Sequence, residues 1–114
     1  MRSYPFIHMS YRFMRVIVMF DLPVVTSSQR REYVRFRKFL LKNGFVMQQE
    51  SIYSKLALNT SIVQRIEDNV RKNKPSEGLV QMLAITEKQY SRMELLVGEV
   101  QSEVIQSDER LIIL

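Results

Sequence analysis

The sequence predicts an α+β domain of the ferredoxin-like class, with the element order strand, helix, strand, strand, helix, strand. Two observations support this order: short runs rich in β-branched and aromatic residues mark four strands, and two segments with apolar residues every three or four positions mark the helices between them. A chain of 114 residues fits one such domain, in which both helices cover one face of an antiparallel sheet.

The first strand is predicted over residues 12–20, which read RFMRVIVMF and are followed by Asp21-Leu22-Pro23. Since side chains alternate along a strand, Val16, Val18 and Phe20 share one face, and Arg15, Ile17, Met19 and Asp21 share the other. Both faces are apolar near the end of this strand. Because the two helices cover only one face, we expect a second copy of the chain to cover the other in a two-fold homodimer.

The first helix is predicted to begin after Thr26, because Gln29 three residues later completes a capping box, and to end before Gly44. Residues 45–58 are divided into two strands near Glu50-Ser51, although no Gly, Asn or Pro marks a turn there. The second helix is expected from Asn59 or Thr60 to a stop at Pro75, and the fourth strand over residues 79–85.

The remaining residues are expected to form an extension of the domain. We place the domain at residues 9–86, the extension at 87–114, and a leader at 1–8 that is either the product of an upstream start codon or a disordered extension. The chain closes on an apolar run that is expected to form an extra strand and to pair with a sheet edge, in the same chain or in a second copy. The residues of this run are Arg110, Leu111, Ile112, Ile113 and Leu114.

The positive charge lies mainly in the N-terminal part of the chain. The net charge is +5, and residues 1–44 contain nine basic and two acidic side chains. Such a surface is either simply solvated or contacts the phosphates of a nucleic acid, and the nearly all-basic first helix favours phosphate contact. The candidate contacts are Arg12, Arg15, Arg30, Arg31, Arg35, Arg37 and Lys38.

Several classes of protein are excluded. The chain has no Cys, and therefore no disulfide framework or thiol nucleophile. No phosphate-binding glycine loop, zinc-protease helix or nucleophile elbow is present, and an RNA-recognition motif would need a signature that is absent. The apolar runs are far shorter than the ~20 residues that span a bilayer, and residues 1–8 lack the apolar core of a signal peptide. We therefore expect a soluble cytoplasmic protein with no membrane contact.

Asp21 is the candidate for catalysis or metal binding. A carboxylate at the tip of an apolar strand is costly to bury unless it is paired, protonated or bound to a metal. In a two-fold dimer the two copies of Asp21 would approach each other, and paired carboxylates suit Mg²⁺, which can activate water against a phosphodiester. The alternative is that Asp21 only shapes the loop before Leu22-Pro23.

Several separated segments resemble the CRISPR-associated protein two family. They are residues 15–23 (RVIVMFDLP), 36–45 (FRKFLLKNGF), 49–55 (QESIYSK) and 86–89 (TEKQ), while residues 107–111 (SDERL) resemble the branch found in type II systems of Gram-positive bacteria. The resemblance covers residues 9–114. One departure is Phe20, where many members of the family carry Tyr before the aspartate.

The resemblance implies a ferredoxin-like homodimer that bridges dimers of the CRISPR integrase and holds the prespacer DNA duplex during spacer acquisition. It implies that residues 110–114 help to contact the integrase. It also implies a metal-dependent endonuclease, often acting on single-stranded RNA, with Asp21 as the Mg²⁺ ligand. Two function hypotheses therefore stand: a scaffold that bridges DNA, and a nuclease, which includes a toxin-type ribonuclease of the same fold.

Overall fold

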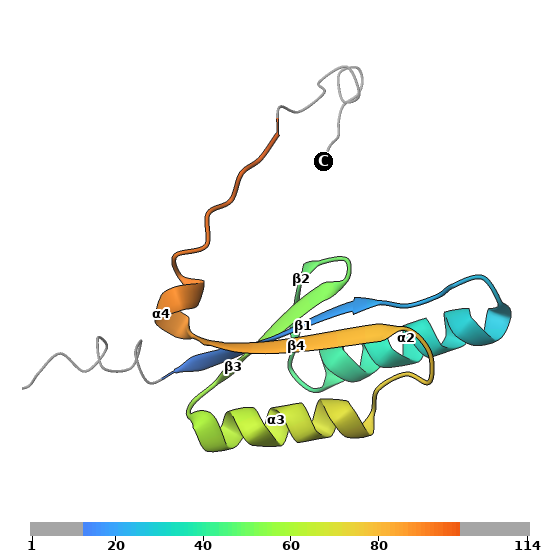
Figure 1. Cartoon of the computed structure of the whole chain (residues 1–114), viewed down its shortest axis with the longest axis horizontal. Coiled ribbons are helices and arrows are strands. Elements are labelled where there is room, and N and C mark those ends of the chain that lie inside the picture. The colour runs from blue at the N-terminus through green and yellow to red at the C-terminus, as the bar shows by residue number, and fades with distance from the viewer. Residues whose placement is uncertain (1–12, 99–114) are drawn as a thin grey trace, which may run out of the picture.

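The structure is a computed structural model, and it describes residues 13–98 (Figure 1). Its four antiparallel strands are β1 (Met14–Asp21), β2 (Val46–Gln49), β3 (Ile52–Ala57) and β4 (Leu79–Thr86), in the sheet order β2-β3-β1-β4. Helix α2 (Ser27–Lys42) connects β1 to β2, α3 (Thr60–Lys72) connects β3 to β4, and the short α4 (Glu87–Tyr90) follows β4. This is the ferredoxin-like arrangement, and it confirms the predicted fold class. The leader at residues 1–8, Arg12 and the closing run at residues 110–114 lie outside the described residues.

The two long helices lie on the same side of the sheet (Figure 1). Val16, Val18 and Phe20 of β1 point toward them and pack with Phe36 and Leu40 of α2 in the buried core. The opposite side is called the open face below. It carries the alternate residues of β1 from Arg15 to Asp21 and their strand neighbours. Three of its leucines are about half exposed among the described residues: Leu56, Leu79 and Leu83.

The local signals for the helices are confirmed. The Thr26 hydroxyl accepts from the Gln29 N–H at 3.0 Å, and the Gln29 side chain accepts from the Thr26 N–H at 3.0 Å, so that the capping box is complete. At the other end of α2, Gly44 has a φ of +91°, a conformation that glycine adopts at little cost. The predicted break between β2 and β3 at Glu50-Ser51 is also present.

Phe20 lies at the centre of an aromatic cluster between the sheet and the helices. Its ring packs edge-on against Phe36 at 5.3 Å and Tyr33 at 6.0 Å between centroids, and it stacks on Tyr53 at 5.7 Å. Aromatic pairs in these geometries contribute beyond the area that they bury. The cluster therefore fixes α2 against the middle of the sheet.

Tyr53 provides a first testable prediction, because its side chain is fully buried and its hydroxyl has no hydrogen-bond partner among the described residues. A buried polar group without a partner costs about 1–3 kcal/mol. We expect Tyr53→Phe to raise the free energy of unfolding by about 1 kcal/mol, measured by urea denaturation of both proteins. A loss of stability of that size would instead show that the hydroxyl makes a bond within the folded protein.

Candidate nucleic-acid interface

Five basic side chains lie on the solvent-facing side of α2 and on its flank, away from the surface that packs on the sheet. Because Phe36 and Leu40 are buried, the opposite side of the helix faces solvent. This surface is called the α2 basic strip, and its residues are Arg30, Arg31, Arg35, Arg37 and Lys38. All are exposed except Arg37, which is half-buried. A shallow hollow along the strip is lined by four of these side chains together with Ser27 and Val34.

Two residues of the α2 basic strip are held in place by the protein. Arg30 donates to the carbonyl of Val25 at 2.8 Å, and Arg35 donates to Glu32 at 3.0 Å and to the carbonyl of Asn73 at 3.0 Å. The hydrogen bonds from Arg35 lower the pKa of Glu32, so that this carboxylate is charged at neutral pH. Arg31, Arg37 and Lys38 make no hydrogen bond or ion pair within residues 13–98. These three cations are available to an external anion.

Arg15 lies on the open face, away from the α2 basic strip, and its guanidinium is already occupied. It donates to both carboxylate oxygens of Glu87, at 2.9 and 2.8 Å, and to the Ser54 hydroxyl at 3.3 Å. The Tyr90 ring lies over the guanidinium at 4.2 Å. These contacts form a fixed ion pair that attaches α4 to the sheet, and the hydrogen bonds to Glu87 raise the pKa of Arg15.

Asp21 is the last residue of β1 and lies beside Leu79 of β4. Its side chain is exposed, so within one chain it carries no burial cost and needs no counter-ion. Gly78 has a φ of +96° and approaches closely, since a Cβ there would lie 2.8 Å from the Asp21 carbonyl. Within residues 13–98, no group of three or more His, Asp or Glu side chains could hold a metal ion. One chain therefore offers a single carboxylate at this point.

The residues that surround Arg15 are not recognisable from the sequence alone. Ser54, Glu87 and Tyr90 are 39 to 75 positions away in the chain, and only the sheet brings them together. The available signal was the strand pairing: Arg15 lies opposite Ile85, and Glu87, two residues further along, is on the same face and diagonal to Arg15.

The ion pair between Arg15 and Glu87 gives a second prediction. Glu87→Gln leaves a partly buried guanidinium without a carboxylate, and we expect it to lower the free energy of unfolding by about 1–2 kcal/mol. A double-mutant cycle with Arg15→Met separates the pair from other effects of each substitution. Glu77→Gln, an exposed change on the loop before β4, is the control and is expected to change stability by less than about 0.5 kcal/mol. An interaction energy near zero in the cycle would contradict the pairing.

Comparison with known proteins identifies the family. The family model described as CRISPR associated protein Cas2 matches residues 14–93, which is most of the chain. The chain belongs to the Cas2 family. It is 54% identical to a Cas2 protein of Treponema denticola over 89% of this chain and the whole of that relative. Two further Cas2 relatives, from Streptococcus mutans and Ligilactobacillus salivarius, are each 46% identical over 89% of this chain, covering 93% and 100% of their own lengths.

All three relatives bear the name CRISPR-associated endoribonuclease Cas2. The fold agrees as well: a solved structure titled "Crystal structure of cas2" superposes with a TM-score of 0.53 and covers 89% of this chain and 99% of its own, at 22% identity. The family resemblance expected from the sequence motifs is thus confirmed. No helix within residues 13–98 is both long enough and apolar enough to cross a membrane.

Proposed function

We propose that this Cas2 protein is a subunit of the CRISPR adaptation complex, in which it bridges integrase dimers and binds the backbone of a double-stranded prespacer. The α2 basic strip is the observation that carries this proposal. Its single acidic neighbour on the helix, Glu32, is neutralised by Arg35, and Arg31, Arg37 and Lys38 are available. Contacts to phosphates fix the position of a duplex without reading its sequence, which is what a bridging subunit requires.

The proposal includes a two-fold homodimer. Leu56, Leu79 and Leu83 leave an apolar surface on the open face, on the side of the sheet opposite the α2 basic strip. A second copy seated on this face would bury the leucines and leave both strips exposed to DNA. Arg15 is excluded from the proposed contacts because Glu87 and Tyr90 already hold it. The expected roles of Arg12 and of residues 110–114, in DNA and integrase contact, concern positions outside the described residues.

A second candidate function is a Mg²⁺-dependent endonuclease acting on single-stranded RNA or DNA, a class that includes toxin-type ribonucleases. The names of the relatives favour it, as does the exposure of Asp21 at the strand end. In this second function the Asp21 carboxylates of two copies would hold the Mg²⁺ ion, and the ion would activate a water molecule for attack on the phosphodiester. Phe20 does not weigh against it, since its ring packs toward the helices whereas Asp21 extends β1 along the open face.

One variant separates the two functions. Asp21→Asn removes the charge and keeps the shape of the side chain, and Glu94→Gln, an exposed change after α4, is the matched control. We expect spacer acquisition in cells to persist within about twofold in both variants, because bridging uses charge and shape. We expect any Mg²⁺-dependent cleavage of single-stranded RNA by the purified protein to fall at least about 100-fold with Asp21→Asn alone.

The scaffold proposal would be overturned by loss of acquisition in Asp21→Asn while the dimer and its integrase complex remain intact. That result would place the carboxylate chemistry inside the pathway and favour the nuclease. Sedimentation of the purified variant and capture of the integrase subunit check both assemblies in the same preparation.

A further inference from the structure

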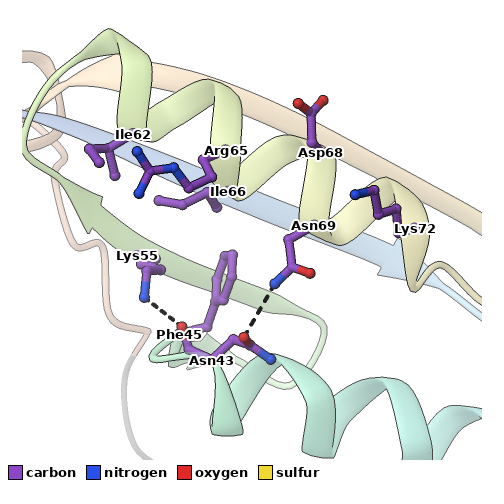
Figure 2. A pocket seen from close by; sticks show the side chains of 9 residues that line it. All are labelled: Asn43, Phe45, Lys55, Ile62, Arg65, Ile66, Asp68, Asn69 and Lys72. Atoms are coloured by element: carbon purple, nitrogen blue, oxygen red, sulfur yellow. Dashed lines mark hydrogen bonds between the residues drawn. The ribbon is translucent and has the colours of Figure 1, made fainter.

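A groove lies on the helix side of the sheet, between the C-terminal end of α2, strand β3 and helix α3 (Figure 2). Its volume is about 500 Å³, within the size range of small-molecule sites. The side chains that line it fall into three kinds: the apolar Phe45, Ile62 and Ile66, the cations Lys55, Arg65 and Lys72, and the polar Asn43, Asp68 and Asn69. None of the three cations was a candidate in the sequence analysis.

The positive charge of this groove is not neutralised within the described part of the chain. Lys55, Arg65 and Lys72 make no ion pair with a carboxylate of residues 13–98. The acidic Asp68 is paired with Arg71 at 2.6 Å, and Figure 2 shows its carboxylate directed away from Phe45. Three cations beside an apolar surface therefore favour an anionic ligand.

Two hydrogen bonds hold the groove in shape. Lys55 Nζ donates to the carbonyl of Asn43 at the end of α2 at 2.5 Å, which orients the ammonium group without cancelling its charge. Asn69 of α3 donates to the Asn43 side chain at 3.2 Å and so joins the two helical walls. Both bonds are drawn in Figure 2. A site whose walls are fixed before binding loses less entropy when a ligand enters.

The lining also indicates what kind of anion fits. Lys55 and Arg65 lie on facing walls near the N-terminal half of α3 (Figure 2), whereas Lys72 lies about 10 Å further along the helix. Phe45 and Ile66 are buried, and their edges form the apolar floor between these ends. Inorganic phosphate would occupy only one end of such a site. A phosphate that carries a larger planar group would use the cations and the floor together.

We propose that this groove binds a nucleoside monophosphate, with the phosphate between Lys55 and Arg65 and the nucleoside over Phe45, Ile62 and Ile66. The nucleotide is either a free metabolite or the 5′-terminal nucleotide of a strand, since both present the same chemistry. This site is separate from the α2 basic strip, which lies on the outward side of α2 and shares no residue with the groove. The proposed bridging function does not depend on it.

The test is a titration of the full chain, labelled with ¹⁵N, with adenosine 5′-monophosphate, inorganic phosphate and a 5′-phosphorylated dinucleotide. We expect adenosine monophosphate to shift the side-chain amide signals of Asn43 and Asn69 in a saturable way, and inorganic phosphate to bind at least tenfold more weakly. The double variant Arg65→Gln, Lys72→Gln removes two exposed cations and is expected to weaken the binding of adenosine monophosphate at least tenfold. Lys42→Gln with Lys74→Gln makes the same change in net charge outside the groove and is expected to have no effect.

The proposal is overturned if adenosine monophosphate gives no saturable shift at 10 mM, roughly the weak limit of specific binding. It is also overturned if inorganic phosphate binds equally well, or if both double variants weaken binding equally. The dinucleotide decides the source of the ligand: tighter binding than adenosine monophosphate assigns the groove to strand ends, and weaker binding assigns it to a free nucleotide. Because duplex DNA binding is measured separately on the α2 basic strip, failure of either proposal can be told from failure of the other.

Discussion

Phe20→Ala is expected to lower the free energy of unfolding by about 3–5 kcal/mol, the cost of removing a buried aromatic side chain. The ring contacts aromatic side chains from both the sheet and α2, at centroid distances of 5.3 to 6.0 Å from Phe36, Tyr53 and Tyr33. Their loss leaves a cavity that the neighbours cannot all fill. In a domain with a total stability of about 5–15 kcal/mol, this change removes between about a fifth and the whole of that stability.

Urea denaturation measures this loss, and Val25→Ala serves as the control because Val25 is exposed before α2. The control is expected to change the free energy of unfolding by less than about 0.5 kcal/mol. A loss below about 1 kcal/mol for Phe20→Ala would show that the aromatic cluster does not hold α2 on the sheet.

The largest functional effect is expected from removing the three available cations of the α2 basic strip, Arg31, Arg37 and Lys38, by substitution with Gln. The logarithm of the association constant falls linearly with the logarithm of the salt concentration, and each lost phosphate contact makes this slope less steep by about 0.9. Three lost contacts make the slope less steep by about 2.7. They weaken duplex binding on the order of 100-fold at 0.1 M salt. Arg30 and Arg35 are kept because they also bond to the protein.

The matched control replaces Arg71, Lys74 and Arg92 with Gln, which changes the net charge equally and leaves the strip intact. We expect this control to retain most of the affinity for duplex DNA and the same dependence of that affinity on salt concentration. Titrations of a fluorescent duplex at several salt concentrations compare the two triple variants. Equal losses in both would show that duplex binding depends on net charge alone, and an unchanged slope in the strip variant would place the DNA elsewhere on the protein.

The fold could be predicted from the sequence because its signals are local. The capping box of Thr26 and Gln29 begins α2, and Gly44 follows its end. Apolar residues recur every three or four positions in the two helices, and the four strands are short runs rich in β-branched and aromatic residues. The α2 basic strip was predictable for the same reason, since the spacing of Phe36 and Leu40 decides which side of one helix faces solvent.

The rest depends on contacts between distant parts of the chain. Arg15 was a candidate for DNA contact because its charge is visible in the sequence, whereas the carboxylate that binds it is 72 positions away. The groove at Lys55 forms only where the end of α2, strand β3 and helix α3 come together in the fold, and no local sequence pattern predicts this arrangement. The proposed metal site at Asp21 needs a second copy of the chain, because within residues 13–98 no group of three or more potential ligands gathers around this carboxylate.

The sheet order has a consequence for how the protein is made. Strand β1 lies in the interior of the sheet between β3 and β4, and Asp21 pairs with a residue of β4, the last strand of the sheet to be synthesised. At about 5–20 residues per second, roughly 3 to 13 seconds of translation separate Asp21 from Thr86. During that interval β1, whose residues 16–20 (VIVMF) are all apolar, has one edge without its partner. Nascent chains stalled before β4 are therefore the form of this protein most exposed to aggregation and to proteases.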